Sequence, residues 1–341
     1  IHPDSIIYGF DTDIDSLKMA KEDGTLTQYF ETLDSTFSSC DIIFLCAPVS
    51  NNIEYLKELK GIISESCLLT DVGSVKEPIQ SAIKELGMES NFIGGHPMAG
   101  SEKTGLSNAS ETLLENAYYI ITPTTKSPSP AVEELTGLVR SLGAIPLVLG
   151  YEQHDYATAA ISHLPHVIAY SLVNLVQESD DENEIMKTIA AGGFKDITRI
   201  ASSSPVMWEN ICLSNQEQIL KLLDNYIHTL EVMRTNIADA DSPALLDAFT
   251  AAKDYRDSIT ITAKGALKNV YELYLDLIDE TGGIATVATI LASNNLSIKN
   301  IGIIHNREFE GGVLRLEMYD GESLALAVAL LKKHHYTIYE R

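Results

Sequence analysis

The stretch GGHPMAGSEKTG, residues 94–105, holds the side chains best suited to proton transfer. It places His96 between a glycine pair and a proline, at the end of a short apolar segment. A neutral imidazole accepts a proton near neutral pH, and Ser101 and Glu102 follow within reach of an oxygen-rich substrate. We interpret His96 as a candidate general base; the alternative is a glycine-rich turn with an incidental histidine.

A second stretch, GGFKDITRIASSSP at residues 192–205, could bind an anion. Lys195 and Arg199 are four residues apart, so a helix would place both on one face. The planar guanidinium of Arg199 can bind both oxygens of a carboxylate. Two solvated basic residues on a surface helix are the alternative. Trp208, the only tryptophan, could form a wall of this pocket or fill the core.

Two histidines lie close together in SHLPH, residues 162–166. Pro165 should kink a helix or mark its start, which would set His163 and His166 on one face. Such a pair could bind zinc, but neither a thiolate nor a clear third carboxylate ligand lies nearby in the sequence. We therefore expect no metal at this position.

A sheet must position these residues, and the apolar runs predict one. The run IIYGFD at residues 6–11 is followed by five more, at residues 40–50, 66–74, 91–97, 117–123 and 144–150. Near-continuous apolar runs with helical patterns between them are typical of a parallel sheet covered on both faces. Ligands of such Rossmann-like α/β folds bind beyond the carboxyl ends of the strands. The residues at these ends are Ala47, Pro48, Val49, Ser74 and His96.

Asp11 ends the first of these runs. In a dinucleotide fold, an acid at the end of the second strand bonds the ribose hydroxyls and repels a 2′-phosphate, so Asp11 favours NAD over NADP. A solvated acid is the alternative. The GxGxxG turn that should precede this strand is absent from the sequence. We expect a first strand and its phosphate-binding turn on an upstream segment.

The pattern changes twice more along the chain, which predicts three domains. Residues 1–150 form the dinucleotide-binding domain, and residues 151–265 show helical periodicity without a good strand, which predicts an all-helical domain. Residues 269–341 follow the order strand, helix, strand, strand, helix, strand, as in α+β ferredoxin-like domains. Backbone amides at the start of its first helix could bind an effector carboxylate, at Thr281, Gly282, Gly283 and Ile284.

Composition excludes several classes of partner. The 341 residues carry a formal net charge of −24 and are 45% hydrophobic, which is typical of an acidic globular protein. We expect binding neither to nucleic acid nor to a membrane, because both attract basic surfaces and apolar runs such as IIFLCAPV are too short to span a bilayer. The four cysteines lack a CxxC pair and no signal peptide opens the sequence, so we expect a reducing, cytoplasmic location.

The motifs above, with TDVGSVKE at residues 70–77, occur in an order that resembles prephenate dehydrogenases, and the C-terminal end resembles ACT regulatory domains. The resemblance implies NAD-dependent oxidative decarboxylation of prephenate to 4-hydroxyphenylpyruvate. It implies His96 as base, Ser74 bonding near His96 and the nicotinamide, and Arg199 holding a substrate carboxylate. It further implies a supporting role for His163 and a pocket lined by Lys195, His166, Glu102 and Ser101.

Three points stay open at this level. Arogenate, which has an amine in place of the keto group, is an alternative substrate. A non-catalytic amino-acid-binding regulatory protein built on a dehydrogenase is an alternative of another class. The resemblance also implies a homodimer whose C-terminal module senses tyrosine, or one whose module serves dimerisation without a ligand.

Overall fold

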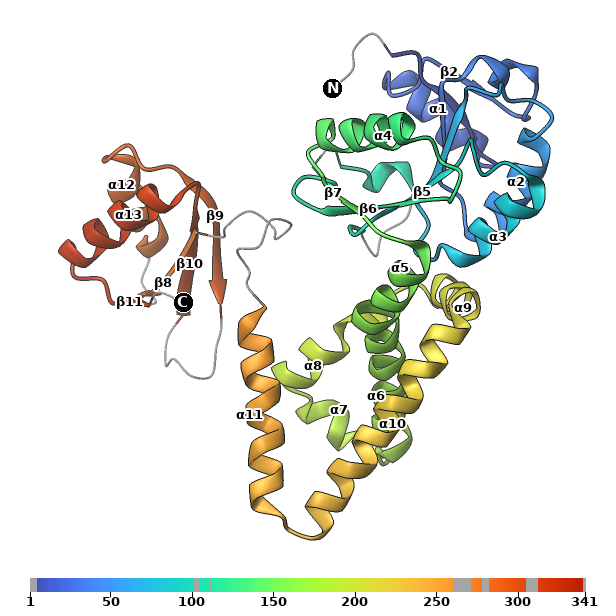
Figure 1. The fold of residues 1–341 in the computed structure, drawn as a ribbon. Helices are drawn as coiled ribbons and strands as arrows, with labels where there is room; N and C mark the ends of the chain where they lie inside the picture. The colour runs from blue at the N-terminus through green and yellow to red at the C-terminus, as the bar shows by residue number, and fades with distance from the viewer. Residues whose placement is uncertain are drawn as a thin grey trace. The chain divides into compact units, whose positions relative to one another are not determined.

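The computed structural model describes residues 5–100, 105–110, 112–259, 271–277, 282–304 and 312–339. The chain divides into two compact units, Ile1–Ile259 and Thr260–Arg341. The first unit contains an α/β part followed by an all-helical part, and the second is an α+β module (Figure 1).

Each of the six predicted apolar runs contains a strand of the α/β part, and with β2 these strands form sheets of two, two and three strands. Parallel pairing joins β1 to β2, β3 to β4 and β6 to β7, and a parallel bridge between Leu69 and Phe92 links β4 to β5. The sequence analysis did not include β2. The strands are β1 (Tyr8–Phe10), β2 (Gln28–Phe30), β3 (Ile42–Leu45), β4 (Leu68–Asp71), β5 (Ile93–Pro97), β6 (Tyr118–Pro123) and β7 (Ile145–Val148).

The prediction of a wholly parallel sheet was wrong at one position. Strands β5 and β6 pair antiparallel, with His96 opposite Ile120. A parallel return requires a crossover that is usually a helix. Among the described residues between these strands, the one helical element is the short 3₁₀ turn η2 (Leu106–Asn108). The chain therefore runs back along β5 instead of crossing over the sheet.

Helices pack on the strands through two apolar cores. Leu56, Ile79 and Ile83 from the helices pack with Leu69 and Phe92 from the strands in one core. In a second core, Leu135 and Val139 of the helix at residues 129–141 pack against β5 and β6. These helices are α1 (Ile14–Glu22), α2 (Val49–Leu59), α3 (Glu77–Leu86) and α4 (Ser129–Ser141), with the 3₁₀ turn η1 (Ser35–Ser39) between α1 and α2.

All elements described between residues 151 and 259 are helical, as predicted. Pro165 lies in the first turn of α6, so it marks a helix start, and the π-helical turn η3 precedes it. Single π-turns are often found at functional sites. The elements are α5 (Tyr151–Thr158), η3 (Ala159–His163), α6 (Leu164–Ser179), α7 (Ile185–Ile189), α8 (Gly192–Thr198), η4 (Arg199–Ser202), α9 (Pro205–Ser214), α10 (Gln216–Ala238) and α11 (Ser242–Ser258).

The continuous run from Tyr151 to Ser179 is long and apolar enough to cross a bilayer, by length and composition alone. Core helices of soluble proteins meet the same criterion. This run carries the buried polar residues His154, Asp155 and His163. Buried polar groups need protein partners, so these residues tie the run to the rest of the unit.

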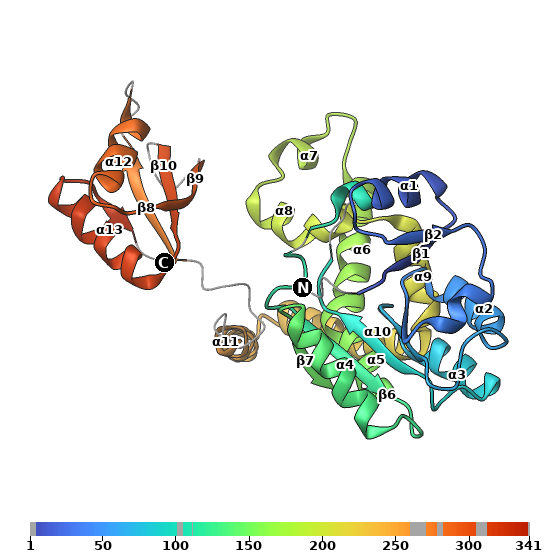
Figure 2. The same ribbon diagram turned by 90° about the horizontal axis from the view of Figure 1, so that it is seen from above.

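Helices α10 and α11 form a helical hairpin that extends away from the sheet (Figure 1), and Figure 2 shows α11 end-on. No residue of α11 is buried. The hairpin exposes large apolar side chains, namely Leu220, Ile227, Leu230, Ile237, Leu246, Phe249 and Tyr255. Apolar residues gathered on exposed helices are typical of a surface that binds another protein chain.

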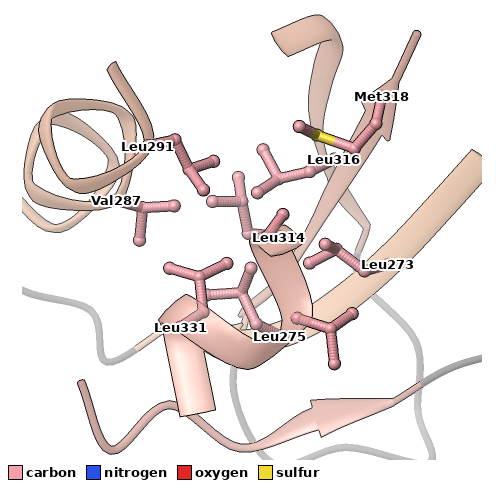
Figure 3. Packing of buried hydrophobic residues seen from close by; sticks show 10 residues of the cluster. Leu273, Leu275, Val287, Leu291, Leu314, Leu316, Met318 and Leu331 are labelled. Carbon is pink, nitrogen blue, oxygen red and sulfur yellow. The ribbon is translucent and has the colours of Figure 1, made fainter. Parts of the chain in front are cut away.

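The second unit has the predicted order of strands and helices. Its antiparallel sheet has the order β11-β8-β10-β9, which is the ferredoxin-like arrangement. Both helices contribute to one leucine-rich core, including Leu291 and Leu331 (Figure 3). The elements are β8 (Tyr271–Leu277), α12 (Gly283–Ala292), β9 (Ile298–Ile304), β10 (Gly312–Met318), α13 (Gly321–Lys333) and β11 (Ile338–Tyr339).

Candidate functional site

A buried row of hydrogen bonds connects His96 at the end of β5 to α5. The Nδ1 atom of His96 lies 2.7 Å from Nε2 of His154, and Nδ1 of His154 lies 2.7 Å from Oδ1 of Asp155. His96 is 9% exposed, and the other two side chains are buried. The candidate base is therefore the outer member of a His-His-Asp row.

This row determines which nitrogen of each neutral imidazole carries the proton. The carboxylate of Asp155 can only accept, so Nδ1 of His154 donates to it and Nε2 of His154 is unprotonated. That Nε2 must then accept from Nδ1 of His96. The proton of neutral His96 is thereby placed on Nδ1, and Nε2 of His96 is left as a basic atom.

Burial also keeps His96 uncharged. Desolvation lowers the pKa of His96 well below its ordinary value, and His154, Lys76 and His163 lower it further. At neutral pH the imidazole is therefore ready to accept a proton.

Glycines precede His96 because there is no space for a side chain. A Cβ on Gly95 would lie 2.6 Å from the carbonyl oxygen of Asp71, and one on Gly94 would lie 2.3 Å from Oγ1 of Thr122. Neither glycine has a positive φ angle. The glycine pair is thus explained by the close approach of neighbouring atoms and not by a backbone conformation that only glycine adopts.

Sequence reasoning did not identify His154, Asp155, Lys76 or Asp71 as residues of this site. Oδ1 and Oδ2 of Asp155 accept bonds of 2.8 Å from the main-chain N–H groups of Lys76 and Glu77, at the start of α3. The ammonium of Lys76 binds the Asp71 carboxylate. The adjacent His154 and Asp155 were one available signal. Their distance of 58 residues from His96 hides the contact in the sequence.

His163 belongs to the same buried network. Nδ2 of Asn215 donates to the carbonyl of Asp155 at 2.9 Å and to Nδ1 of His163 at 3.1 Å. Burial lowers the pKa of His163 to about 4, so it is neutral at pH 7. Because Nδ1 of His163 accepts, its proton lies on Nε2. The supporting role of His163 in the reaction stays a prediction.

An aromatic wall adjoins these histidines. The ring of His166 stacks on Trp208 at 3.5 Å between centroids, and His163 meets the same indole edge-on at 6.0 Å. Trp208 packs with Val75, the residue after Ser74. Burial chiefly lowers the pKa of His166, and the nearby Arg199 cation lowers it further. Arg199, His166 and Trp208 thus share one neighbourhood.

The two basic residues of the second motif differ in position from the prediction. Helix α8 ends at Thr198, and Arg199 begins a 3₁₀ turn, so one α-helix does not carry both. Both side chains are exposed. Arg199 is the one of the two that lowers the pKa of His166.

The strand-end residues lie largely where the sequence predicted. Ala47 and Pro48 follow β3, and Val49 begins α2. A Cβ on Gly73 would lie 3.3 Å from Cγ2 of Val49, so the ends of β3 and β4 are close together. Asp11 is exposed directly after β1.

Ser74 is half-buried after β4, next to Val75 of the Trp208 cluster. Within the described residues, the hydrogen-bond partner of His96 is His154 and not Ser74. The implied bonding of Ser74 near His96 therefore has no counterpart in the described structure.

Ser101, Glu102 and Thr281 lie outside the described residues. Gly282 caps α12 in the left-handed region with φ of +95°, which favours glycine. Gly283 is buried and Ile284 is 39% exposed in the first turn of that helix.

Comparison with known proteins identifies the family. Residues 1–147 match the family described as "Prephenate dehydrogenase, nucleotide-binding domain", and residues 151–261 match "Prephenate dehydrogenase, dimerization domain". The chain is 39% identical to prephenate dehydrogenase of Bacillus subtilis (strain 168) over 317 residues, which covers 92% of this chain and 85% of the relative.

Two solved structures are similar to this chain over about three quarters of its length. Prephenate dehydrogenase from A. aeolicus, in complex with hydroxyphenyl propionate and NAD+, has a TM-score of 0.71 at 30% identity and covers 76% of this chain and 90% of its own. Synechocystis arogenate dehydrogenase has a TM-score of 0.68 at 29% identity and covers 75% of this chain and 91% of its own. The chain belongs to the prephenate dehydrogenase family.

Proposed function

We propose that the chain oxidises prephenate with NAD and releases carbon dioxide, 4-hydroxyphenylpyruvate and NADH. The observation that carries this proposal is the row His96-His154-Asp155, which leaves Nε2 of His96 basic at the end of β5. A dehydrogenase that oxidises an alcohol needs such a base near the hydride acceptor.

The strand ends present groups that suit NAD. Asp11 offers an exposed carboxylate for ribose hydroxyls, and Val49 lies close to Gly73 at the neighbouring strand ends. When bound there, NAD supplies the acceptor of the hydride. The same carboxylate disfavours a 2′-phosphate, so NAD is the expected cofactor and NADP is not.

His96 would move the proton of the substrate hydroxyl. Its Nε2 accepts that proton from the ring C4 hydroxyl while C4 loses a hydride, and the C4–O bond becomes a carbonyl. The ring carboxylate then leaves as carbon dioxide, and its bonding electrons make the ring aromatic. His96 can return its proton to the phenolate oxygen, so the reaction neither consumes nor releases a proton overall.

The aromatic wall and Arg199 would bind the substrate. Nε1 of Trp208 is buried and has no hydrogen-bond acceptor within the described structure. An unsatisfied buried donor costs about 1–3 kcal/mol, so an oxygen of a bound ligand would stabilise it. Arg199 beside His166 suits a carboxylate. Lys195, Ser101 and Glu102 remain proposed pocket residues on sequence grounds.

Arogenate is the second candidate substrate. The similarity to Synechocystis arogenate dehydrogenase favours testing it. NADH formation should be measured with prephenate and arogenate side by side, using enzyme expressed from its complete gene. Higher kcat/KM with prephenate supports the proposal, and higher kcat/KM with arogenate favours the second candidate. Turnover of neither substrate would favour a non-catalytic amino-acid-binding protein.

A cytoplasmic homodimer is the proposed state of the enzyme. The match of residues 151–261 to a dimerization domain supports it, as do the exposed apolar side chains of α10 and α11. A second copy of the chain would cover this surface.

The second unit is proposed to be an ACT-like module that binds tyrosine. Its ferredoxin-like sheet and the Gly282 cap of α12 support this proposal. The similarity to the Bacillus subtilis enzyme is longer than the span of the two matched family domains, so it extends into this unit. Main-chain amides near Thr281, Gly283 and Ile284 would bind the effector carboxylate.

A further inference from the structure

Lys76 is fully buried although it carries a charged side chain. Its ammonium binds the carboxylate of Asp71 and donates to the carbonyl of Gly95 at 2.6 Å. Oδ1 of the same aspartate accepts from the N–H of Gly95 at 3.1 Å. The ion pair thus binds both polar groups of the residue that immediately precedes His96.

The main chain of Lys76 binds the other end of the histidine row. Its N–H donates to Oδ1 of Asp155, the oxygen that also accepts from Nδ1 of His154. The next N–H, from Glu77, donates to Oδ2. Both oxygens of the Asp155 carboxylate are thereby bound by main-chain amides at the start of α3.

We infer that Lys76 is a positioning residue for the proposed oxidation, because it holds His96 through Gly95 and holds His154 through Asp155. One residue therefore sets the distance between the two imidazoles from both sides. This inference rests on the proposed role of His96 as base.

A buried ion pair is expensive to desolvate and often adds little stability. The complete burial of Lys76 and Asp71 therefore needs another explanation, and positioning of His96 provides one. The Lys76 cation also lowers the pKa of His96, which keeps that base neutral. The titratable groups packed around Lys76 and His96 are Asp71, His154, Asp155 and His163.

The test is the double variant Lys76→Met/Asp71→Asn, which removes the ion pair without leaving a buried charge alone. In protein labelled with ring-¹⁵N histidine, NMR titration should show the pKa of His96 shifted upward relative to the parent. The His96 signal is identified by its loss in His96→Asn. Turnover of prephenate should fall roughly 10-fold or more with KM unchanged, because misplacement of a catalytic group is costly.

Lys84→Met is the matched control, since Lys84 is exposed in the last turn of α3. It should change neither the pKa nor kcat. A folded double variant with an unchanged His96 pKa overturns the inference, even if kcat falls, because a merely structural role predicts that result. The NMR titration needs no turnover, so an inactive parent would refute the proposed function separately.

Discussion

Nδ1 of His96 and Nε2 of His154 lie 2.7 Å apart, although 58 residues separate them in the sequence. One imidazole comes from the sheet and the other from the first helix after it. Asp155 determines which ring nitrogen of His154 carries the proton. The contact between the two imidazoles therefore also determines which ring nitrogen of neutral His96 carries it. The basic atom of the site thus depends on packing between the α/β part and the helical part.

The His154→Phe variant should therefore lose activity without losing substrate binding. Phenylalanine keeps a ring of similar size but cannot accept from Nδ1 of His96. The proton of His96 could then move to Nε2, the wrong atom, and kcat should fall on the order of 10²-fold with KM little changed. Steady-state kinetics measures both constants. Unchanged kcat would show that His154 does not orient the base.

The pH dependence should report a neutral base. Burial lowers the pKa of His96 well below its usual range. The neutral form is the active one, so kcat/KM should be constant above that pKa and fall as the pH is lowered through it. A pH profile of kcat/KM should place this acidic limb below pH 6.5, the ordinary value of histidine. A limb above neutral pH would contradict the account.

Arg199→Leu should weaken binding of prephenate. A charge-assisted bond made equally in the ground and transition states affects KM more than kcat. We expect KM to rise roughly 10- to 100-fold, the equivalent of about 1.5–3 kcal/mol. Arg140→Leu, at an exposed position near the end of α4, is the matched control. Equal KM values for both variants would return Arg199 to the role of a solvated surface residue.

Removal of residues 260–341 should abolish inhibition by tyrosine while leaving catalysis. The first unit contains the whole histidine row, and the deleted residues form a separate compact unit. The coupling free energy between an effector site and an active site is typically about 1–3 kcal/mol. Bound tyrosine should therefore weaken the affinity of the parent enzyme for prephenate about 5- to 150-fold. Inhibition of the truncated enzyme as strong as that of the parent would mean competition at the prephenate site.

The pattern of apolar residues predicted most of the helices and strands, because the spacing of apolar residues within each element depends on the type of that element. The six apolar runs became strands, and Pro165 begins a helix because it lacks an N–H. The antiparallel step at β6 was not predictable, since an apolar run does not record its direction. For the same reason, the sequence of the second unit predicted the order of its strands and helices along the chain but not which strands pair.

The site was predicted only where function and local sequence coincide. His96 and His166 lie in recognisable motifs. The roles of His154, Asp155 and Lys76 depend on contacts between residues that are 58 to 79 positions apart in the sequence. Burial of such polar side chains depends on tertiary packing, which periodicity does not describe. The reason for Gly94 and Gly95 was likewise visible only in the packing around them.

The central claim is that His96 is the base of the proposed oxidation, and His96→Asn tests it most directly. Asparagine keeps a polar side chain but cannot take the proton, so kcat with prephenate should fall by roughly 10²–10⁴-fold. The Kd for NAD, measured by calorimetry, should stay unchanged, and His228→Asn on an exposed part of α10 should leave both values as in the parent. Parental kcat in His96→Asn would contradict the account and remove His96 from the mechanism.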